Sequence, residues 1–434
     1  MTVERLRTRA LLSAALAVCA LVLSPTSRLL AAGKETLLHS FNGGDGIYPE
    51  AADLVADGAG NLYGTTYYGG ANGDGVVFEL ESSGNGKWVQ KVLYSFNRGG
   101  QGGYAPKSGL IFDTVGNLYG TTTYGGPPGF GTVFELTPNG DGTWSEKVVH
   151  GFTFKDGSAP YGGLVFDAAG NLYGTTYYGG SGKCQAFETT VGCGVVFELT
   201  PGGNGKWTEK VLHNFSPGSG DGHYPQAGLV RDAAGNLYGT TFEGGAYNTG
   251  CGGGGCGTAF RLTPGAKGRW SETIVHNFDN DGTDGYLPIT RLIVDKAGNL
   301  YGTTPYGGCS GGYCGVAFKL TPGGAGKWTE SVLHTFLGVG NDGRLPVADL
   351  VSDKAGNLYG TTYYGGASSS GTAFELKRNS KGKWVIELLY TFDYSNGGGD
   401  GPSAGLVFGK AGNLYGTTYY GGTYGDGIIF EVSP

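Results

Sequence analysis

Seven near-copies of the segment Gly-Asn-Leu-Tyr-Gly-Thr-Thr run through the chain, and they constrain its fold more than any other feature. Their tyrosines are Tyr63, Tyr119, Tyr173, Tyr238, Tyr301, Tyr359 and Tyr415. The copies follow one another at intervals of 54 to 65 residues. A period of this size indicates one supersecondary unit repeated along the chain, each unit burying its apolar face against its neighbours.

Each repeat is predicted to hold four short strands. In the third repeat we expect them at residues 163–167, 171–176, 195–200 and 207–215. Glycine is abundant, at 89 of 434 residues, but the glycines stand at fixed offsets between apolar and aromatic runs, so the composition does not indicate disorder. Four strands per unit without helical periodicity are typical of a β-propeller blade.

The two ends of the repeated region complement each other. The seventh repeat supplies three strands and stops at Pro434 without a fourth. Residues 34–41 align with the fourth strand of the third repeat, residues 208–215. We therefore predict an all-β, seven-bladed propeller with four antiparallel strands per blade, whose last blade is closed by the N-terminal strand. Such a ring has no exposed terminal edge.

The first 32 residues have a different character. Arg5, Arg7 and Arg9 precede an apolar run over residues 10–23, and Ala31 and Ala32 follow. This pattern predicts a signal peptide at residues 1–32 and a propeller domain at 33–434, because the run is too short for an ordinary membrane span. We expect a secreted monomer, periplasmic or extracellular, with no transmembrane segment after cleavage. The net charge of −7 does not favour nucleic acid as a partner.

Six cysteines fall at the same place in three consecutive repeats. The couples are Cys184 with Cys193, Cys251 with Cys256, and Cys309 with Cys314. We predict three local disulfides, which an oxidising compartment permits. A metal site is the alternative, but no histidine recurs beside these cysteines, and we assign no metal ligand and no cofactor. Residues 279–285 pack oxygen ligands densely enough for a candidate calcium loop, although their spacing does not match an EF-hand.

The repeat motif resembles a known bacterial family. The segment Gly-Asn-Leu-Tyr-Gly-Thr-Thr-Tyr-Tyr-Gly-Gly, followed by Gly-Val-Val-Phe-Glu-Leu-Thr, is similar to the GloVer (choice-of-anchor) tandem repeat proteins over residues 34–434. The resemblance implies a secreted or surface-held propeller of the cell envelope and implies no particular activity. The hairpin is also similar to those of NHL-type and gluconolactonase-like propellers, which include scaffolds and enzymes, so it selects no chemistry.

The loops on one face of a propeller surround the mouth of its central channel, and here these loops are rich in tyrosine and aspartate. Many loops between the second and third strands begin with aromatic pairs, whose second members include Tyr68, Tyr178, Tyr364 and Tyr420. Most loops that precede a first strand carry Asp-Gly and then proline, with the aspartates Asp45, Asp156, Asp221, Asp284, Asp342 and Asp400. The tyrosines are candidates for stacking on sugar rings. The alternative is that these repeated side chains pack between blades or close turns.

Residues that break the repeat are stronger candidates, because a site for an asymmetric ligand must break the ring's pseudo-symmetry. Where other repeats place glycine at the start of the first strand, this chain has Asp53, Arg291 and Asp349, which we expect to line the channel, with Arg291 and Asp349 able to pair. Further candidates are Glu243, which replaces a tyrosine, and the unrepeated His223 and Arg344. Solvated charges around one structural ion pair are the alternative. The histidines that recur in the fourth strands are expected to be structural.

Three functions remain open from sequence. We favour a binding or scaffold module for a polysaccharide, an extracellular protein or another cell-envelope partner. The alternative is a carbohydrate-active enzyme, a glycoside hydrolase or polysaccharide lyase, with Glu243 and Asp349 or Asp53 as acid and base and Arg291 binding an anionic sugar. A purely structural role is the third. No residue is assigned as catalytic.

Overall fold

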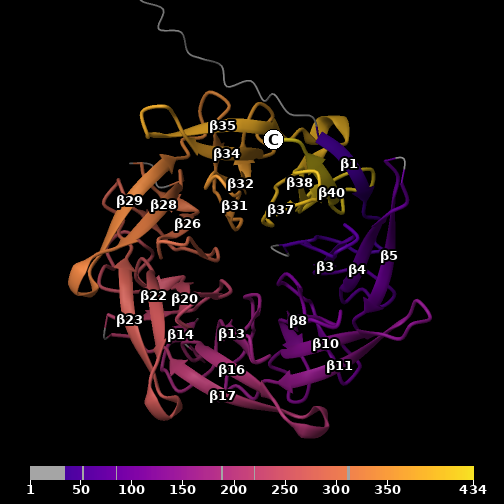
Figure 1. Cartoon of the computed structure of the whole chain (residues 1–434), viewed down its shortest axis with the longest axis horizontal. Helices are drawn as coiled ribbons and strands as arrows, with labels where there is room; N and C mark the ends of the chain where they lie inside the picture. Colours follow the sequence, from indigo (N-terminus) through magenta and orange to yellow (C-terminus); the bar gives the residue numbers. More distant parts are fainter. Residues whose placement is uncertain (1–34, 51–52, 85, 187–188, 219, 310–312) are drawn as a thin grey trace, which may run out of the picture.

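The computed structural model is a closed ring of seven blades around a central channel (Figure 1). It describes residues 35–50, 53–84, 86–186, 189–218, 220–309 and 313–434. The predicted signal peptide lies outside these residues. Within them, seven antiparallel sheets have four strands each, which confirms the predicted fold. We call the strands A to D from the channel outward and number the blades 1 to 7 by the chain order of strand A.

Strand A is short in every blade and lies at the channel: β2 Val55–Ala56, β7 Ile111–Phe112, β12 Val165–Phe166, β19 Val230–Arg231, β25 Ile293–Val294, β31 Val351–Ser352 and β37 Val407–Phe408. Strand B follows: β3 Leu62–Thr66, β8 Leu118–Thr122, β13 Leu172–Thr176, β20 Leu237–Thr241, β26 Leu300–Thr304, β32 Leu358–Thr362 and β38 Leu414–Thr418.

Strands C and D form the outer hairpins. Strand C is β4 Val76–Ser82, β10 Thr132–Pro138, β16 Val195–Pro201, β22 Thr258–Pro264, β28 Val316–Pro322, β34 Thr372–Arg378 and β40 Ile428–Val432. Strand D is β5 Trp88–Ser95, β11 Trp144–Gly151, β17 Trp207–Asn214, β23 Trp270–Asn277, β29 Trp328–Thr335, β35 Trp384–Thr391 and, in blade 7, β1 Glu35–Ser40.

Short elements decorate the loops. Two-residue ladders join the loop before strand A to the loop after strand B: β6 Gly103–Tyr104 with β9 Tyr124–Gly125, β18 Gly222–His223 with β21 Glu243–Gly244, β24 Gly285–Tyr286 with β27 Tyr306–Gly307, β30 Gly343–Arg344 with β33 Tyr364–Gly365, and β36 Gly399–Asp400 with β39 Tyr420–Gly421. The others are β14 Gln185–Ala186, β15 Thr189–Thr190 and the 3₁₀ turns η1 Gly203–Gly205, η2 Ala266–Gly268, η3 Gly324–Gly326 and η4 Tyr394–Asn396.

The repeated motif explains the hairpin between strands A and B. In blade 1, Asp57 Oδ1 accepts hydrogen bonds from the amides of Gly60 and Asn61. Gly60 has a φ of +99°, a conformation that favours glycine. Tyr63 donates its hydroxyl to Glu79 on strand C at 2.7 Å. The motif is therefore a set of turn and strand contacts within one blade.

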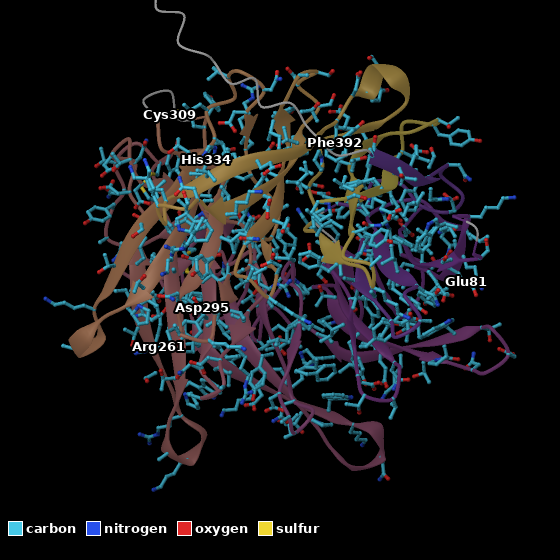
Figure 2. The ribbon with its side chains drawn as sticks, turned by 45° about the horizontal axis from the view of Figure 1, so that its top comes forward. Glu81, Arg261, Asp295, Cys309, His334 and Phe392 are labelled. Carbon is cyan, nitrogen blue, oxygen red and sulfur yellow. A yellow bond between two sulfur atoms is a disulfide. The ribbon has the colours of Figure 1, made fainter. Side chains whose placement is uncertain are left out.

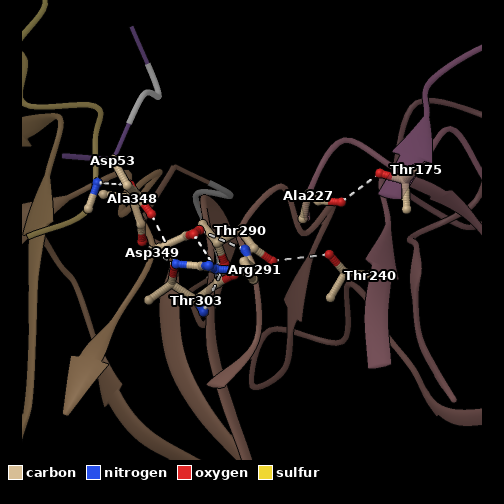
Figure 3. Close-up of polar contacts among 10 residues, drawn as sticks. Asp53, Thr175, Ala227, Thr240, Thr290, Arg291, Thr303, Ala348 and Asp349 are labelled. Carbon is tan, nitrogen blue, oxygen red and sulfur yellow. Dashed lines mark hydrogen bonds and ion pairs between the residues drawn. The ribbon is translucent and has the colours of Figure 1, made fainter. Parts of the chain in front are cut away.

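The first threonine of each Thr-Thr pair links its blade to the next. Thr175 donates to the Ala227 carbonyl at 2.8 Å, and Thr240 donates to the Thr290 carbonyl at 3.2 Å (Figure 3). The equivalent threonines of the other blades are Thr65, Thr121, Thr303, Thr361 and Thr417. Each acceptor lies at the start of the neighbouring strand A, so these bonds position the residues that face the channel.

Phenylalanines fill the interfaces between blades. A phenylalanine directly after strand D packs against one in strand C of the next blade, with ring centroids 4.9 to 5.3 Å apart. Figure 2 labels Phe392 and shows side chains filling the space between the ribbons. All fourteen rings are fully buried: Phe41, Phe96, Phe152, Phe215, Phe278, Phe336, Phe392, Phe78, Phe134, Phe197, Phe260, Phe318, Phe374 and Phe430. The core is therefore repeated at every interface instead of being gathered at one centre.

The N-terminal strand closes the ring as the sequence predicted. β1 pairs antiparallel with β40, and in Figure 1 the indigo β1 lies beside the yellow β40. Leu38 has no partner in this pairing and forms a β-bulge, as Leu93 does at the equivalent position in blade 1. A bulge turns the following side chains toward a new direction. β1 therefore takes the place of strand D in blade 7, with six residues instead of the eight of the other blades, although it comes from the other end of the chain.

The three predicted disulfides are present. They join Cys184 to Cys193, Cys251 to Cys256, and Cys309 to Cys314. Each one closes the loop between strands B and C, in blades 3, 4 and 5. None of the helical turns in the described ranges has the length and apolar character needed to cross a membrane.

Candidate functional site

A cavity of about 710 Å³ opens at the mouth of the central channel. It is lined by the residues that lead into strand A and by tyrosines of the loops between strands B and C. Ligand sites in proteins are commonly concave, with volumes of roughly 300 to 1,000 Å³. The cavity therefore has the size of a site for a small ligand or for the end of a chain.

Three charged side chains form the floor of this cavity. Arg291 donates from Nε to Asp349 Oδ2 at 3.1 Å and from Nη2 to Asp53 Oδ2 at 3.2 Å (Figure 3). The Arg291 amide also donates to Asp349 Oδ1 at 2.7 Å. Asp53 Oδ1 accepts from the Gly405 amide in blade 7 at 2.6 Å. One network thus joins blades 5, 6, 7 and 1 across the channel, and it extends the pairing expected from sequence.

The surroundings of Asp349 favour its protonated form. Burial raises the pKa of Asp349 to about 8, reinforced by the adjacent Asp53 and opposed by Arg291. Burial lowers the pKa of Arg291, but Asp349 and Asp53 outweigh it, so the net effect raises this pKa and the guanidinium stays charged. The side chain of Arg291 keeps 36% of its surface accessible. The floor therefore offers a fixed cation and a proton-sharing pair of carboxyl groups to a ligand in the cavity.

A second ring of side chains lies above the floor. In each blade the residue directly after the repeated proline lines the cavity, and it differs every time: Glu50, Lys107, Tyr161, Gln226, Ile289, Val347 and Ser403. The first four, in blades 1 to 4, are polar, whereas Ile289 and Val347 make the opposite wall apolar. Lys107 Nζ lies 3.3 Å from Glu50 Oε1 and over the Tyr161 ring. Ser403 of blade 7 is also polar, so the ring is polar except at blades 5 and 6.

Tyrosines form the upper wall. Tyr306, Tyr363 and Tyr419 line the cavity, and Tyr364 and Tyr420 line it while remaining 39% exposed. Burial raises the pKa of Tyr419 to about 12, so its hydroxyl stays protonated and can donate. Because an aromatic ring offers an apolar face and a phenol a polar tip, this wall can pack against a ring and hydrogen-bond to its substituents.

The other five sequence candidates lie outside the lining of this cavity. Glu243 pairs across the β18–β21 ladder with His223, and Oε2 lies 3.5 Å from His223 Nε2. Arg344 pairs across β30–β33 with Tyr364 and lies 5.3 Å from the centre of its ring. Tyr68 and Tyr178 hold the corresponding places in blades 1 and 3, where they bridge to Ile47 and Ser158. These five residues lie on the same face, outside the cavity lining, and we call them the outer crown.

The structure therefore separates the predicted site residues into a group that lines the cavity and a group that does not. It brings Asp53, Arg291 and Asp349 together and adds Tyr364 and Tyr420. Glu243 does not line the cavity with the floor carboxyl groups, so the proposed acid–base pairs that include it are not assembled there. The sequence analysis did not identify the residues that directly follow the repeated proline. The sequence does mark them, because this position has a fixed place in the repeat while its side chain changes in every copy.

The repeated aspartates serve the loops themselves. Asp284 accepts from His276 and from the amides of Asp279 and Gly285. Asp281 Oδ1 accepts from the Thr283 amide and hydroxyl. Two of the carboxylates of the candidate calcium loop, Asp281 and Asp284, are thus engaged by hydrogen-bond donors.

One predicted member of the aspartate set differs. Asp400 pairs with Tyr420 across β36–β39, as Arg344 pairs with Tyr364 in blade 6. Gly398 therefore stands where the other loops have their aspartate, and the alignment of Asp400 with that set was wrong.

Comparison with known proteins identifies the family. Residues 27–252 and 251–434 match the Gloeobacter/Verrucomicrobia repeat, so the chain belongs to the family defined by that repeat. This agrees with the resemblance seen in the motif. No curated protein matches the chain in sequence.

Solved structures share the propeller architecture at low sequence identity. The extracellular domain of a protein described as a hybrid two-component system of B. thetaiotaomicron is 15% identical, with a TM-score of 0.52 over 92% of this chain. The match spans 41% of that solved extracellular domain, less than half of its length. A protein described as a 6-phosphogluconolactonase of Bacteroides uniformis is 14% identical, with a TM-score of 0.50 over 82% of this chain and 88% of its own. At these identities the likeness shows the fold alone.

Proposed function

We propose that this chain is an exported binding module that holds a carbohydrate at the mouth of its channel. The observation that carries the proposal is the two-sided cavity, with tyrosines and Val347 on one wall and Glu50, Lys107 and Gln226 on the other. A sugar ring has the same two-sided character, because its C–H faces are apolar and its hydroxyl edge is polar. The three disulfides fit an oxidising compartment, where polysaccharides are accessible.

The charged floor sets a preference within this class. Arg291 and the proton on Asp349 can both donate, and Asp53 can accept, so the floor suits the end of a sugar chain that presents hydroxyl or carboxyl groups.

The rigidity of the closed ring also supports binding. The cavity is lined by all seven blades, whose interfaces are packed with buried phenylalanines, so a ligand meets a preformed site and little binding energy is lost to ordering.

A glycan array on the purified chain tests the proposal, and a blocking variant locates the site. Val347→Trp places an indole into the cavity and should abolish binding to any glycan that the array identifies. Val339→Trp is the matched control, because Val339 is 67% exposed and does not line the cavity. A blank array, or equal binding by both variants, would reject carbohydrate binding at this site.

Acid–base catalysis is the second candidate, and it rests on one observation. Burial raises the pKa of Asp349 to about 8, so its carboxyl group can hold a proton at neutral pH and donate it to a ligand, and Asp53 lies beside it. An enzyme of this kind would release reducing ends or unsaturated products from the bound glycan, and Asp349→Asn would stop the release. A glycan that binds and is recovered intact would leave binding as the function.

A further inference from the structure

Three side chains with metal-ligand chemistry meet between blades 3 and 4, away from the channel cavity. His213 comes from β17, Asp221 from the loop that follows it, and Glu272 from β23 of the next blade. His213 Nε2 lies 3.4 Å from Asp221 Oδ2 and 3.6 Å from Glu272 Oε2. One atom from each residue can be chosen so that all three lie within 4.8 Å of one another.

These separations suit a shared ion better than direct hydrogen bonds. Hydrogen bonds between nitrogen and oxygen have lengths of about 2.7 to 3.2 Å. Zn²⁺ binds imidazole nitrogen and carboxylate oxygen at about 2.0 to 2.2 Å, which places two ligands of a tetrahedral site roughly 3.3 to 3.6 Å apart. The distances from His213 Nε2 to the two carboxylate oxygens match this ligand-to-ligand spacing.

Each of these three residues has one buried polar atom without a hydrogen-bond partner among the described residues. His213 Nε2, Asp221 Oδ1 and Glu272 Oε1 are each buried without a hydrogen-bond partner in the part of the chain that the structure describes. The Asp221 side chain is only 9% exposed, and its Oδ2 is held by the Ser216 amide at 3.0 Å. A buried polar atom left unpaired costs about 1 to 3 kcal/mol. Of the three, His213 Nε2 is the atom that approaches the other residues, at Asp221 Oδ2 and Glu272 Oε2, so an ion bound there would engage a nitrogen that otherwise has no partner within the described ranges.

The equivalent position at the other interfaces is closed or incomplete. His276 Nε2 is hydrogen-bonded to Asp284 at 2.9 Å, and His150 Nε2 to Asp156 at 3.2 Å, so the imidazole nitrogen is committed in both. Strand D offers Gln90 or Ile386 instead of a glutamate in blades 1 and 6. Tyr94 replaces the histidine in blade 1, where it faces Glu146. The interface between blades 3 and 4 is thus distinguished by a free histidine nitrogen with two carboxylates.

We propose that His213, Asp221 and Glu272 bind one Zn²⁺ ion that joins blade 3 to blade 4. One imidazole and two carboxylates form a ligand set that divalent first-row metals accept, and their charge of −2 balances that of the ion. Three protein ligands leave a fourth position for water. Because two of the ligands lie in blade 3 and one in blade 4, binding requires the folded ring and stabilises it.

Zinc binding to the whole chain, freed of metal by a chelator and then dialysed, tests this site. Isothermal titration with ZnCl₂ should show one saturable equivalent, and Zn²⁺ should raise the melting temperature by several degrees. Glu272→Gln keeps the shape of the side chain but removes a ligand charge, so Zn²⁺ should bind about 100-fold more weakly or not at all, and the thermal shift should disappear. Co²⁺ in place of Zn²⁺ should give the intense visible absorption of a four-coordinate site.

Matched controls separate this site from general effects of the mutation. Glu146→Gln changes the same strand position in blade 2, which faces Tyr94, and should leave zinc binding unchanged. The melting temperature of metal-free Glu272→Gln shows whether the variant is folded. The proposal is overturned if the native chain shows no saturable binding, if Glu272→Gln binds as the native chain does, or if Glu330→Gln, at the next interface, is the variant that loses the ion.

Discussion

Thr417 of blade 7 donates a hydrogen bond of 3.1 Å to the carbonyl of Pro49, which leads into blade 1. The equivalent threonine donates to the next blade at every other interface. Thr121 also donates to a proline carbonyl, that of Pro160, whereas Thr175 donates to Ala227, two residues after the proline. The interface where the two ends of the chain meet is therefore built like those within the chain. It should also be as stable, and this can be measured.

Phe41→Ala tests the closure of the ring. Phe41 is fully buried and packs against Phe78 across the interface between blades 7 and 1. Removing a buried phenylalanine ring should lower the free energy of unfolding by about 3 to 5 kcal/mol. Phe215→Ala, the equivalent change within the chain, should cost a similar amount in the same urea titration.

Leu37→Ala is the control for the strand itself, because Leu37 is 45% exposed. It should change stability by no more than about 0.5 kcal/mol. If Phe41→Ala were as mild as Leu37→Ala, the N-terminal strand would not be part of the cooperative fold, and the closure would be wrong.

Arg291→Met tests the floor of the cavity. The change leaves Asp53 and Asp349 together without their cation, and the free energy of unfolding should fall by about 1 to 3 kcal/mol. This is less than the 3 to 5 kcal/mol of a fully buried pair, because 36% of the arginine side chain is accessible. Adding Asp53→Asn and Asp349→Asn should restore most of the loss in chemical denaturation. Equal stability of the single variant and the native chain would mean that the network has no structural role.

Cys251→Ala with Cys256→Ala tests the disulfides. The Cys256 carbonyl accepts a hydrogen bond from the Leu287 amide of the next blade at 2.8 Å. For so short a loop, the chain-entropy estimate gives a loss of about 2 kcal/mol. Hydrogen exchange should accelerate at the Leu287 amide, while the Leu345 amide, bonded to Cys314 one blade further on, stays protected. Uniform acceleration at both amides would contradict a local role.

Glu330 makes stability depend on pH. Burial, together with the nearby Asp284, raises the pKa of Glu330 to about 8 from its ordinary value of 4.5. Between these values the folded chain holds a proton that the unfolded chain has released, so the native state loses stability as pH rises from about 5 to about 9. Glu330→Gln cannot ionise and should show a smaller fall in melting temperature over this range, measured without metal. Glu387→Gln, at a side chain that is 45% accessible, should follow the native chain, and equal slopes for all three would exclude Glu330 as the source.

Most of the fold could be predicted because many of the contacts that shape a blade lie within a single repeat. The Asp57 turn, the Tyr63 bond to Glu79 and the cysteine couples are local, so their spacing in sequence reveals them. The strand at residues 35–40 could be recognised because it repeats a pattern found six more times. Strand A was expected over five residues and forms over two, since only its middle pairs with strand B.

The site could be predicted only in part. Asp53, Arg291 and Asp349 stood out because they replace glycine at a position known to face the channel. Whether a pair of tyrosines lines the cavity depends on the curvature of its loop, and sequence does not give this. Tyr363 and Tyr419 line the cavity, while Tyr68 does not. The free nitrogen of His213 depends on differences of a few tenths of an ångström between interfaces that look alike in sequence.

A comparison of Tyr420→Ala with Tyr68→Ala tests most directly whether the channel mouth is the binding site. The two tyrosines hold the same place in adjacent blades, are 39% and 42% exposed, and both contact Tyr48, but only Tyr420 lines the cavity. Affinity for the glycan chosen from the array, measured by titration calorimetry, should fall about tenfold for Tyr420→Ala and stay unchanged for Tyr68→Ala. Equal affinities for the two variants, or a loss only for Tyr68→Ala, would contradict a site in the channel and move it to the outer crown.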